Sequence, residues 1–230
     1  MLVCFWSPKG GSGTSVIAAS AALVLARRGP VRLADLTGDL PAVLGMSGDP
    51  DTGLREWLRV GPQAPTDALA HLEHRVDDRV ALLPAGVTTL APAAPEAGAA
   101  LAVALRDDAR TTIVDAGRID HPALYALAEI ADANVPVVRA CYLALRRAVR
   151  HPALELARGA VLIEEHGRAL GVRDVEDVLG VPVLARIEAR TSIAHAVDAG
   201  VLAARMPDSL LRPLRQMLSQ LGCADDERAA

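Results

Sequence analysis

Lys9 is the only lysine in this 230-residue chain, and it lies in a run of small residues. The run reads Ser-Pro-Lys-Gly-Gly-Ser-Gly-Thr-Ser from Ser7 to Ser15 and directly follows the apolar stretch Leu2–Trp6. Every other permanently charged cation is an arginine. A single compact ammonium kept in such a loop suits a point-charge contact with phosphate. We therefore predict a phosphate-binding loop between a strand and a helix.

The three glycines of this loop support that prediction. They allow the backbone to approach a ligand closely and to adopt positive φ. Ser15 opens a predicted helix, whose free N–H groups and dipole favour an anion. A tight turn without a ligand is the alternative interpretation. The residues that we expect to bind a nucleotide are Lys9, Gly10, Gly11, Ser12, Gly13, Thr14 and Ser15.

Seven short apolar runs predict the strands that position this loop. They are Leu2–Trp6, Val31–Asp35, Val80–Leu83, Thr111–Asp115, Val135–Arg139, Ala160–Ile163 and Val183–Ile187. Helical periodicity predicts helices near 14–28, 52–60, 66–74, 96–108, 121–132, 142–156, 172–179, 191–198 and 208–221. This alternation indicates right-handed βαβ units and an α/β fold with three α/β/α layers around a mostly parallel, doubly wound sheet.

The chain length favours one domain over residues 1–223, followed by a short acidic tail at 224–230 that we expect to be disordered. Pro84–Ala97 reads as a loop after a strand. The net charge of −4 argues against a generally nucleic-acid-binding protein. Three widely spaced cysteines and an apolar run too short to span a bilayer predict a soluble, cytoplasmic protein with reduced thiols.

The loop resembles the deviant Walker A motif of the MinD/ParA ATPases, usually Lys-Gly-Gly-x-Gly-Lys-Ser/Thr, and Lys9 matches the signature lysine. Val31–Asp35 resembles the second strand with its switch aspartate. Thr112–Gly117 resembles the Walker B strand and second switch. The chain is most similar to the actinobacterial CpaE/TadZ-like branch through Gly167–Leu170, Val175–Val183 and Ala199–Leu202.

This resemblance implies a P-loop fold that binds ATP or ADP with Mg²⁺. In the family, two subunits enclose two ATP molecules, and Lys9 would reach the partner's nucleotide in a homodimer. Ser15 and Asp115 resemble the pair that positions Mg²⁺, and Lys9 and Asp35 are the candidate catalytic residues. Asp115 could instead cap the turn at Gly117, Asp35 could be a turn carboxylate, and Thr14 could be an ordinary first helical residue.

Three departures from the family pattern weaken the case for a rapid ATPase, two through hydrolysis and one through recognition of the base. Thr14 replaces the lysine that contacts the β- and γ-phosphates within the same subunit, so a cation is lost. Thr37 replaces a second switch aspartate, and a neutral hydroxyl is a poor base. Glu164 and Glu165 follow a strand where the family commonly presents an asparagine to adenine, which makes base specificity less secure than phosphate binding.

Two other features suggest partners that we do not favour. The leucine-rich helix at 208–221 resembles a membrane-targeting helix, but its few cations and the acidic tail favour core packing or a partner face. A DNA-binding patch is conceivable where arginines gather, although a solvated helix face is the simpler interpretation. That cluster comprises Arg139, Arg146, Arg147 and Arg150, with His151.

The favoured hypothesis is an ATP-gated dimeric switch or scaffold with weak or no hydrolysis. It would position cellular machinery (pilus or secretion, septum or chromosome partitioning) with an unknown protein partner. An active MinD/ParA-type ATPase and a pseudo-ATPase that binds no nucleotide are the alternatives. A metabolic relative is disfavoured because paired cluster cysteines are missing, and a tyrosine-kinase relative because the chain has no C-terminal tyrosine cluster.

Overall fold

The strands form a single eight-stranded sheet with the order β3-β4-β2-β5-β1-β6-β7-β8. The structure is a computed structural model, and it describes residues 1–65, 67–89 and 93–223. Every neighbouring pair is parallel except β3 and β4. The strands are β1 (Leu2–Trp6), β2 (Val31–Asp35), β3 (His74–Arg75), β4 (Val80–Leu83), β5 (Thr111–Asp115), β6 (Ala133–Arg139), β7 (Ala160–Glu164) and β8 (Val183–Glu188).

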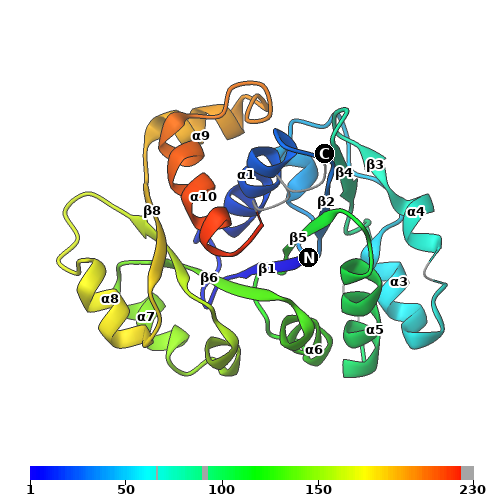
Figure 1. Cartoon of the computed structure of the whole chain (residues 1–230), viewed down its shortest axis with the longest axis horizontal. Coiled ribbons are helices and arrows are strands. Elements are labelled where there is room, and N and C mark those ends of the chain that lie inside the picture. Colours follow the sequence, from blue (N-terminus) through cyan, green and yellow to red (C-terminus); the bar gives the residue numbers. More distant parts are fainter. Residues whose placement is uncertain (66, 90–92, 224–230) are drawn as a thin grey trace.

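Helices cover both faces of the sheet, as the predicted three-layer architecture requires (Figure 1). One face carries α1 (Thr14–Ala26), α2 (Leu40–Val43), α9 (Thr191–Asp198) and α10 (Asp208–Gln220). The other carries α3 (Leu54–Val60), α4 (Ala68–Leu72), α5 (Pro95–Arg106), α6 (Pro122–Ile130), α7 (Tyr142–Ala148) and α8 (Val172–Leu179). The described residues also form two 3₁₀ helices, η1 (Gly61–Gln63) and η2 (Pro152–Leu156).

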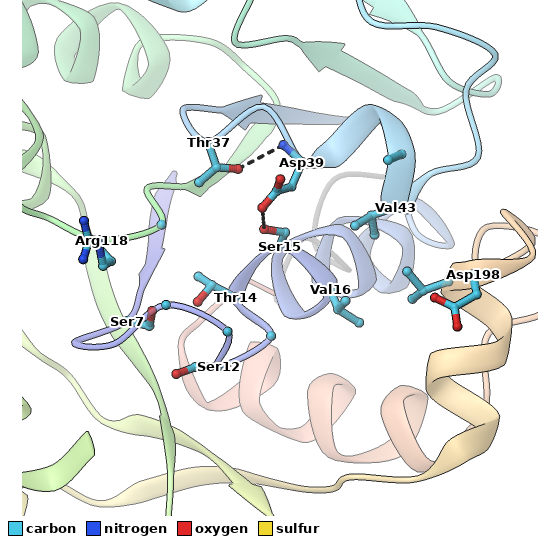
Figure 2. Close-up of a pocket in the computed structure, with 16 residues that line it drawn as sticks. Ser7, Ser12, Thr14, Ser15, Val16, Thr37, Asp39, Val43, Arg118 and Asp198 are labelled. Atoms are coloured by element: carbon cyan, nitrogen blue, oxygen red, sulfur yellow. Dashed lines mark hydrogen bonds between the residues drawn. The ribbon is translucent and has the colours of Figure 1, made fainter. Parts of the chain in front are cut away.

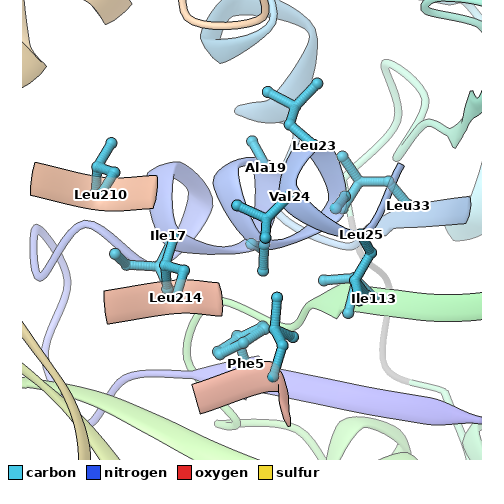
Figure 3. Close-up of a cluster of buried hydrophobic side chains, with 14 of the residues drawn as sticks. Phe5, Ile17, Ala19, Leu23, Val24, Leu25, Leu33, Ile113, Leu210 and Leu214 are labelled. Atoms are coloured by element: carbon cyan, nitrogen blue, oxygen red, sulfur yellow. The ribbon is translucent and has the colours of Figure 1, made fainter. Parts of the chain in front are cut away.

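Alternation along β1 divides its side chains between two cores. Val3 and Phe5 face the cluster around α1, whereas Leu2, Cys4 and Trp6 face α5 and α6. All five residues are fully buried, which explains why the strand reads as a continuous apolar run. Figure 3 shows the first cluster, in which α1 packs against strand residues such as Phe5 and Ile113 and against Leu210 and Leu214 of α10.

The helix α10 confirms the core-packing interpretation of its leucines. Its apolar residues are buried against α1 and β8, so the face that a membrane would need is already occupied inside the protein. These buried residues are Leu210, Leu211, Leu214, Met217 and Leu218, followed by Leu221. Within the described ranges, no helix is both long enough and apolar enough to cross a membrane.

The structure corrects three local predictions. The helix expected over 142–156 ends at Ala148, because Pro152 lacks a backbone donor and His151 accepts the Ala153 amide hydrogen bond to start η2. The helix expected over 66–74 is shorter, and His74 belongs to a two-residue antiparallel strand. The short helix α2 was not predicted. The acidic tail and residues 90–92 of the predicted loop lie outside the described residues.

Candidate functional site

The carboxyl ends of β1, β2 and β5 meet at one edge of the sheet. Asp115 lies in register with both Phe5 and Asp35, so three chain segments far apart in sequence converge there. A cavity of about 640 Å³ opens above these strand ends. Parallel α/β sheets bind ligands at this edge. Figure 2 shows the lining residues, which come from the glycine-rich loop, α1, the segment after β2, Gly117, Arg118 and α9.

The predicted phosphate loop has the backbone that its glycines suggested. Gly11 and Gly13 have φ values of 75° and 88°, in the left-handed region that glycine tolerates best. The Ser7 and Ser12 hydroxyls both donate to the Lys9 carbonyl oxygen, which closes the loop on itself. Gly13 precedes α1 without a side-chain cap, and the first turn has no acidic residue. The first amides of α1 are therefore available to an anion.

Asp35, predicted as a catalytic residue, is buried beneath the cavity and is not among the described residues that line it. Its carboxylate accepts hydrogen bonds from the amides of Thr37, Gly38 and Leu40 and from the Thr37 hydroxyl. Burial raises the pKa of this carboxyl, although those hydrogen bonds oppose the rise. These hydrogen bonds hold the segment after β2, as the turn-carboxylate alternative expects, and the catalytic role of Asp35 stays a prediction.

Thr37 joins the two buried carboxylates. Its hydroxyl oxygen lies 2.9 Å from Asp35 Oδ1 and 3.1 Å from Asp115 Oδ2. Because a hydroxyl has one proton, it donates to one carboxylate at a time. Burial, and then the charge of Asp35, raise the pKa of Asp115 to about 6, while hydrogen bonds from Ser15, Gly117 and Thr37 lower it.

Ser15 lies beside two carboxylates, those of Asp39 and of Asp115, which was predicted with Ser15 to position Mg²⁺. Asp115 accepts a hydrogen bond from Ser15, and the Ser15 hydroxyl lies 3.5 Å from Asp39 Oδ2. One hydroxyl and two carboxylates are the hard oxygen donors that Mg²⁺ prefers, so the donor set fits this ion. Across the described ranges, no cluster of three or more His, Cys, Asp or Glu side chains is arranged to hold a metal. A cation here would need ligands from bound phosphate or water.

The ammonium of Lys9 is not part of the cavity lining in the described chain. Glu165, which follows β7, is hydrogen-bonded by Arg168 and lies 2.7 Å from Arg139 Nη1. Arg168, then Arg139, and to a smaller degree Lys9, hold the pKa of Glu165 below its usual range. Lys9 therefore lies in the field of this carboxylate, at the edge of β6 and β7.

The structure adds three charged residues to the predicted site, all of which line the cavity. Asp39 is exposed within it, and its amide donates to the Thr37 hydroxyl. Arg118 follows Gly117 after β5, and Asp198 ends α9. The spacing of Asp39, two residues after Thr37, was a usable signal. Nothing local to Asp198 indicates a position beside a loop that lies far earlier in the chain.

The predicted arginine cluster is divided between different environments. Arg139 pairs with Glu165, whereas Arg146, Arg147 and Arg150 are exposed. His151 is half-buried, and its ring centroid lies 4.5 Å from that of Trp6. The solvated-face interpretation fits the three exposed arginines, and DNA binding stays an unfavoured prediction.

The sheet order, the glycine-rich loop and the cavity at the strand ends define the fold of the MinD and ParA ATPases. Solved structures confirm this assignment of the fold. No protein-family model matches the chain, and no curated protein matches it significantly.

Three solved structures illustrate the similarity. The cell division ATPase MinD of Pyrococcus furiosus is 22% identical, with a TM-score of 0.75 over 96% of this chain and 100% of that one. A ParA family ATPase of Chlorobium tepidum is 21% identical, with a TM-score of 0.73 over 95% and 97%. MinD of Pyrococcus horikoshii, solved with Mg-ADP, is 19% identical, with a TM-score of 0.74 over 98% and 97%.

Proposed function

We propose that this chain is a MinD/ParA-like protein that binds ATP or ADP with Mg²⁺ and works as a nucleotide-gated dimeric switch or scaffold with weak or no hydrolysis. One observation carries the weak-hydrolysis part. Both oxygens of the Asp35 carboxylate are occupied by hydrogen bonds from its own turn, and the residue is 0% exposed. A carboxylate held in this way is poorly placed to take a proton from an attacking water in the cavity.

Binding is supported by a different set of residues. Gly11 and Gly13 shape the loop, the amides at the start of α1 have no side-chain cap, and Ser15 supplies a hydroxyl beside Asp115. These groups can bind phosphate and a divalent cation without a lysine at Thr14. The loss of one preorganised donor costs about 3–4 kcal/mol of transition-state stabilisation. The missing lysine therefore slows hydrolysis and still leaves the groups that bind the nucleotide.

The dimer is supported by the position of Lys9. Its side chain lies outside its own cavity and in the field of Glu165. A cation that does not serve its own site is suited to the nucleotide of a second subunit, which would make dimerisation depend on the triphosphate. The positioning role and a further protein partner follow from the CpaE/TadZ-like resemblance and from fold neighbours named as cell division proteins. We place this activity in the cytoplasm.

The test is calorimetric titration of ATP and ADP, each with Mg²⁺, into wild type and Lys9→Ala. Sedimentation and phosphate release are measured on the same samples. We expect wild type to bind and to dimerise with ATP at negligible turnover, and Lys9→Ala to remain monomeric. Dimers of Lys9→Ala at saturating ATP would contradict the role of Lys9. The absence of binding at millimolar nucleotide would leave a pseudo-ATPase scaffold.

An active ATPase is the second candidate, and Asp39 is the observation that favours it. Asp39 is an exposed carboxylate inside the cavity and lies 3.5 Å from the Ser15 hydroxyl. It could orient water where Thr37 cannot. Phosphate release well above background in wild type, abolished in Asp39→Asn without loss of ATP binding, would replace the switch proposal with this one.

A further inference from the structure

The charges around the cavity are unbalanced for a phosphate ligand. Asp39 and Asp198 line it, and Asp35 and Asp115 lie buried beneath it. Thr14 contributes only a hydroxyl where the sequence pattern would place a lysine. Within residues 1–65, 67–89 and 93–223, Arg118 is the only cation among the lining residues. A polyphosphate in this cavity would therefore find one arginine to offset its charge within the subunit.

The backbone of Arg118 is held firmly at the rim of the cavity. The preceding residue, Gly117, accepts a hydrogen bond from the Ser7 amide at 2.7 Å and donates to Asp115 Oδ1 at 3.1 Å. Arg118 is thereby tied both to the start of the phosphate loop and to the end of β5. Figure 2 shows Arg118 and Asp198 at opposite sides of the view, with Thr14 and Val16 between them.

The side chain of Arg118, in contrast, is held weakly. Its guanidinium donates to Asp120 at 2.7 Å, and both side chains are 57% exposed. Exposed ion pairs of this kind contribute little stability because water and salt screen them. A planar guanidinium also matches two phosphate oxygens at once. If the Arg118 guanidinium left Asp120 to contact phosphate, the protein would therefore lose little stability.

We propose that Arg118 provides, within the same subunit, the phosphate-binding cation that Thr14 does not. This inference rests on the proposed nucleotide binding. Arg118 binds the polyphosphate from the second switch instead of from the phosphate loop, and it leaves Asp120 when the ligand is present. The cavity thus has a cation from its own subunit, and Lys9 stays available to the nucleotide of a second subunit.

The test is calorimetric titration of Mg-ATP into Arg118→Ala, with Arg190→Ala as the matched control. Arg190 donates to Glu188 two residues away, both side chains are 58% exposed, and neither lines the cavity in the described chain. We expect Arg118→Ala to weaken binding about tenfold, as loss of one charge-assisted contact does, and Arg190→Ala to bind as wild type does.

One double variant tests the replacement itself. Thr14→Lys in the Arg118→Ala background should restore affinity to within about threefold of wild type, because either cation then serves the same phosphates. Melting curves verify that each variant is folded. Equal affinity of Arg118→Ala and Arg190→Ala would overturn the inference and leave the proposed function intact. No binding of Mg-ATP by wild type would overturn both.

Discussion

At the scale of single residues, Thr37 connects more groups than any prediction assigned to it. Its hydroxyl contacts Asp35, Asp115 and the Asp39 amide, and its carbonyl oxygen accepts a hydrogen bond from Arg55. Its methyl group occupies the space beside Gly117, where an added Cβ would lie 2.4 Å from Thr37 Cγ2. Thr37 therefore connects the segments that follow β2 and β5.

This packing predicts a coupling between Gly117 and Thr37. Gly117→Ala should destabilise the fold by about 2–3 kcal/mol, through its φ of 56° and the clash with the methyl group. Thr37→Ser removes that methyl and should recover about 1 kcal/mol in the double variant. Urea unfolding measures both effects. Gly180→Ala, at φ 69° with open space around it, is the control for φ alone. Additive losses for Gly117 and Thr37 would contradict the coupling.

At the scale of elements, a partly buried ion-pair network ties β2 to β5 at the end opposite the cavity. Arg32, only 6% exposed in its side chain, lies 2.6 Å from both Glu73 and Asp108. Arg110 contacts the same two carboxylates. The hydrogen bond from Arg110 is the main cause that lowers the pKa of Asp108 to about 2. Removing one partner from such a network leaves an uncompensated charge.

Asp108→Asn should therefore destabilise the protein by about 1–3 kcal/mol at pH 7. A depressed folded pKa means that the stabilisation is present above the unfolded pKa, near 3.8, and is lost as pH falls toward 2. The difference between wild type and variant should shrink over that range. Unfolding measured at several pH values checks this outcome. A difference that stays constant from pH 5 to pH 2 would show that the carboxylate charge is not the cause.

At the scale of the whole molecule, the cavity joins residues from nearly the full length of the chain. The phosphate loop connects β1 to α1 near the start of the chain, whereas Val197 and Asp198 belong to α9, late in the chain. The helices α2 and α9 contact each other and bring this late segment over the cavity. The site is therefore a property of the assembled domain and not of the loop alone.

Asp198 gives this arrangement a measurable consequence. Its carboxylate lines a cavity that we propose binds a polyanion, so Asp198→Asn should tighten Mg-ATP binding about two- to threefold at low salt. Asp177→Asn, on α8 away from the cavity, is the control and should bind as wild type does. Calorimetry at low and at high salt separates charge from shape. Weaker binding by Asp198→Asn would mean that this carboxylate contacts the ligand or its cation.

Elements with local sequence signals were predictable before the fold was known. The seven predicted strands are confirmed because each is a short apolar run, and all but the edge strand β8 are almost entirely buried. The loop from Ser7 to Ser15 was equally readable, since its glycines are needed wherever φ is positive. The strand β3 was missed because two exposed residues carry no periodicity, and their pairing with β4 is a tertiary contact.

The contacts of the charged side chains, in contrast, depend on how the elements pack. Asp35 turns inward to its own backbone, Lys9 lies away from its own cavity, and Arg118 and Asp198 come to line that cavity from separate elements. Residue type and spacing could not decide between these arrangements and their alternatives. Each depends on which strand ends are neighbours and on which helix covers them, and those contacts link residues that are distant in the chain.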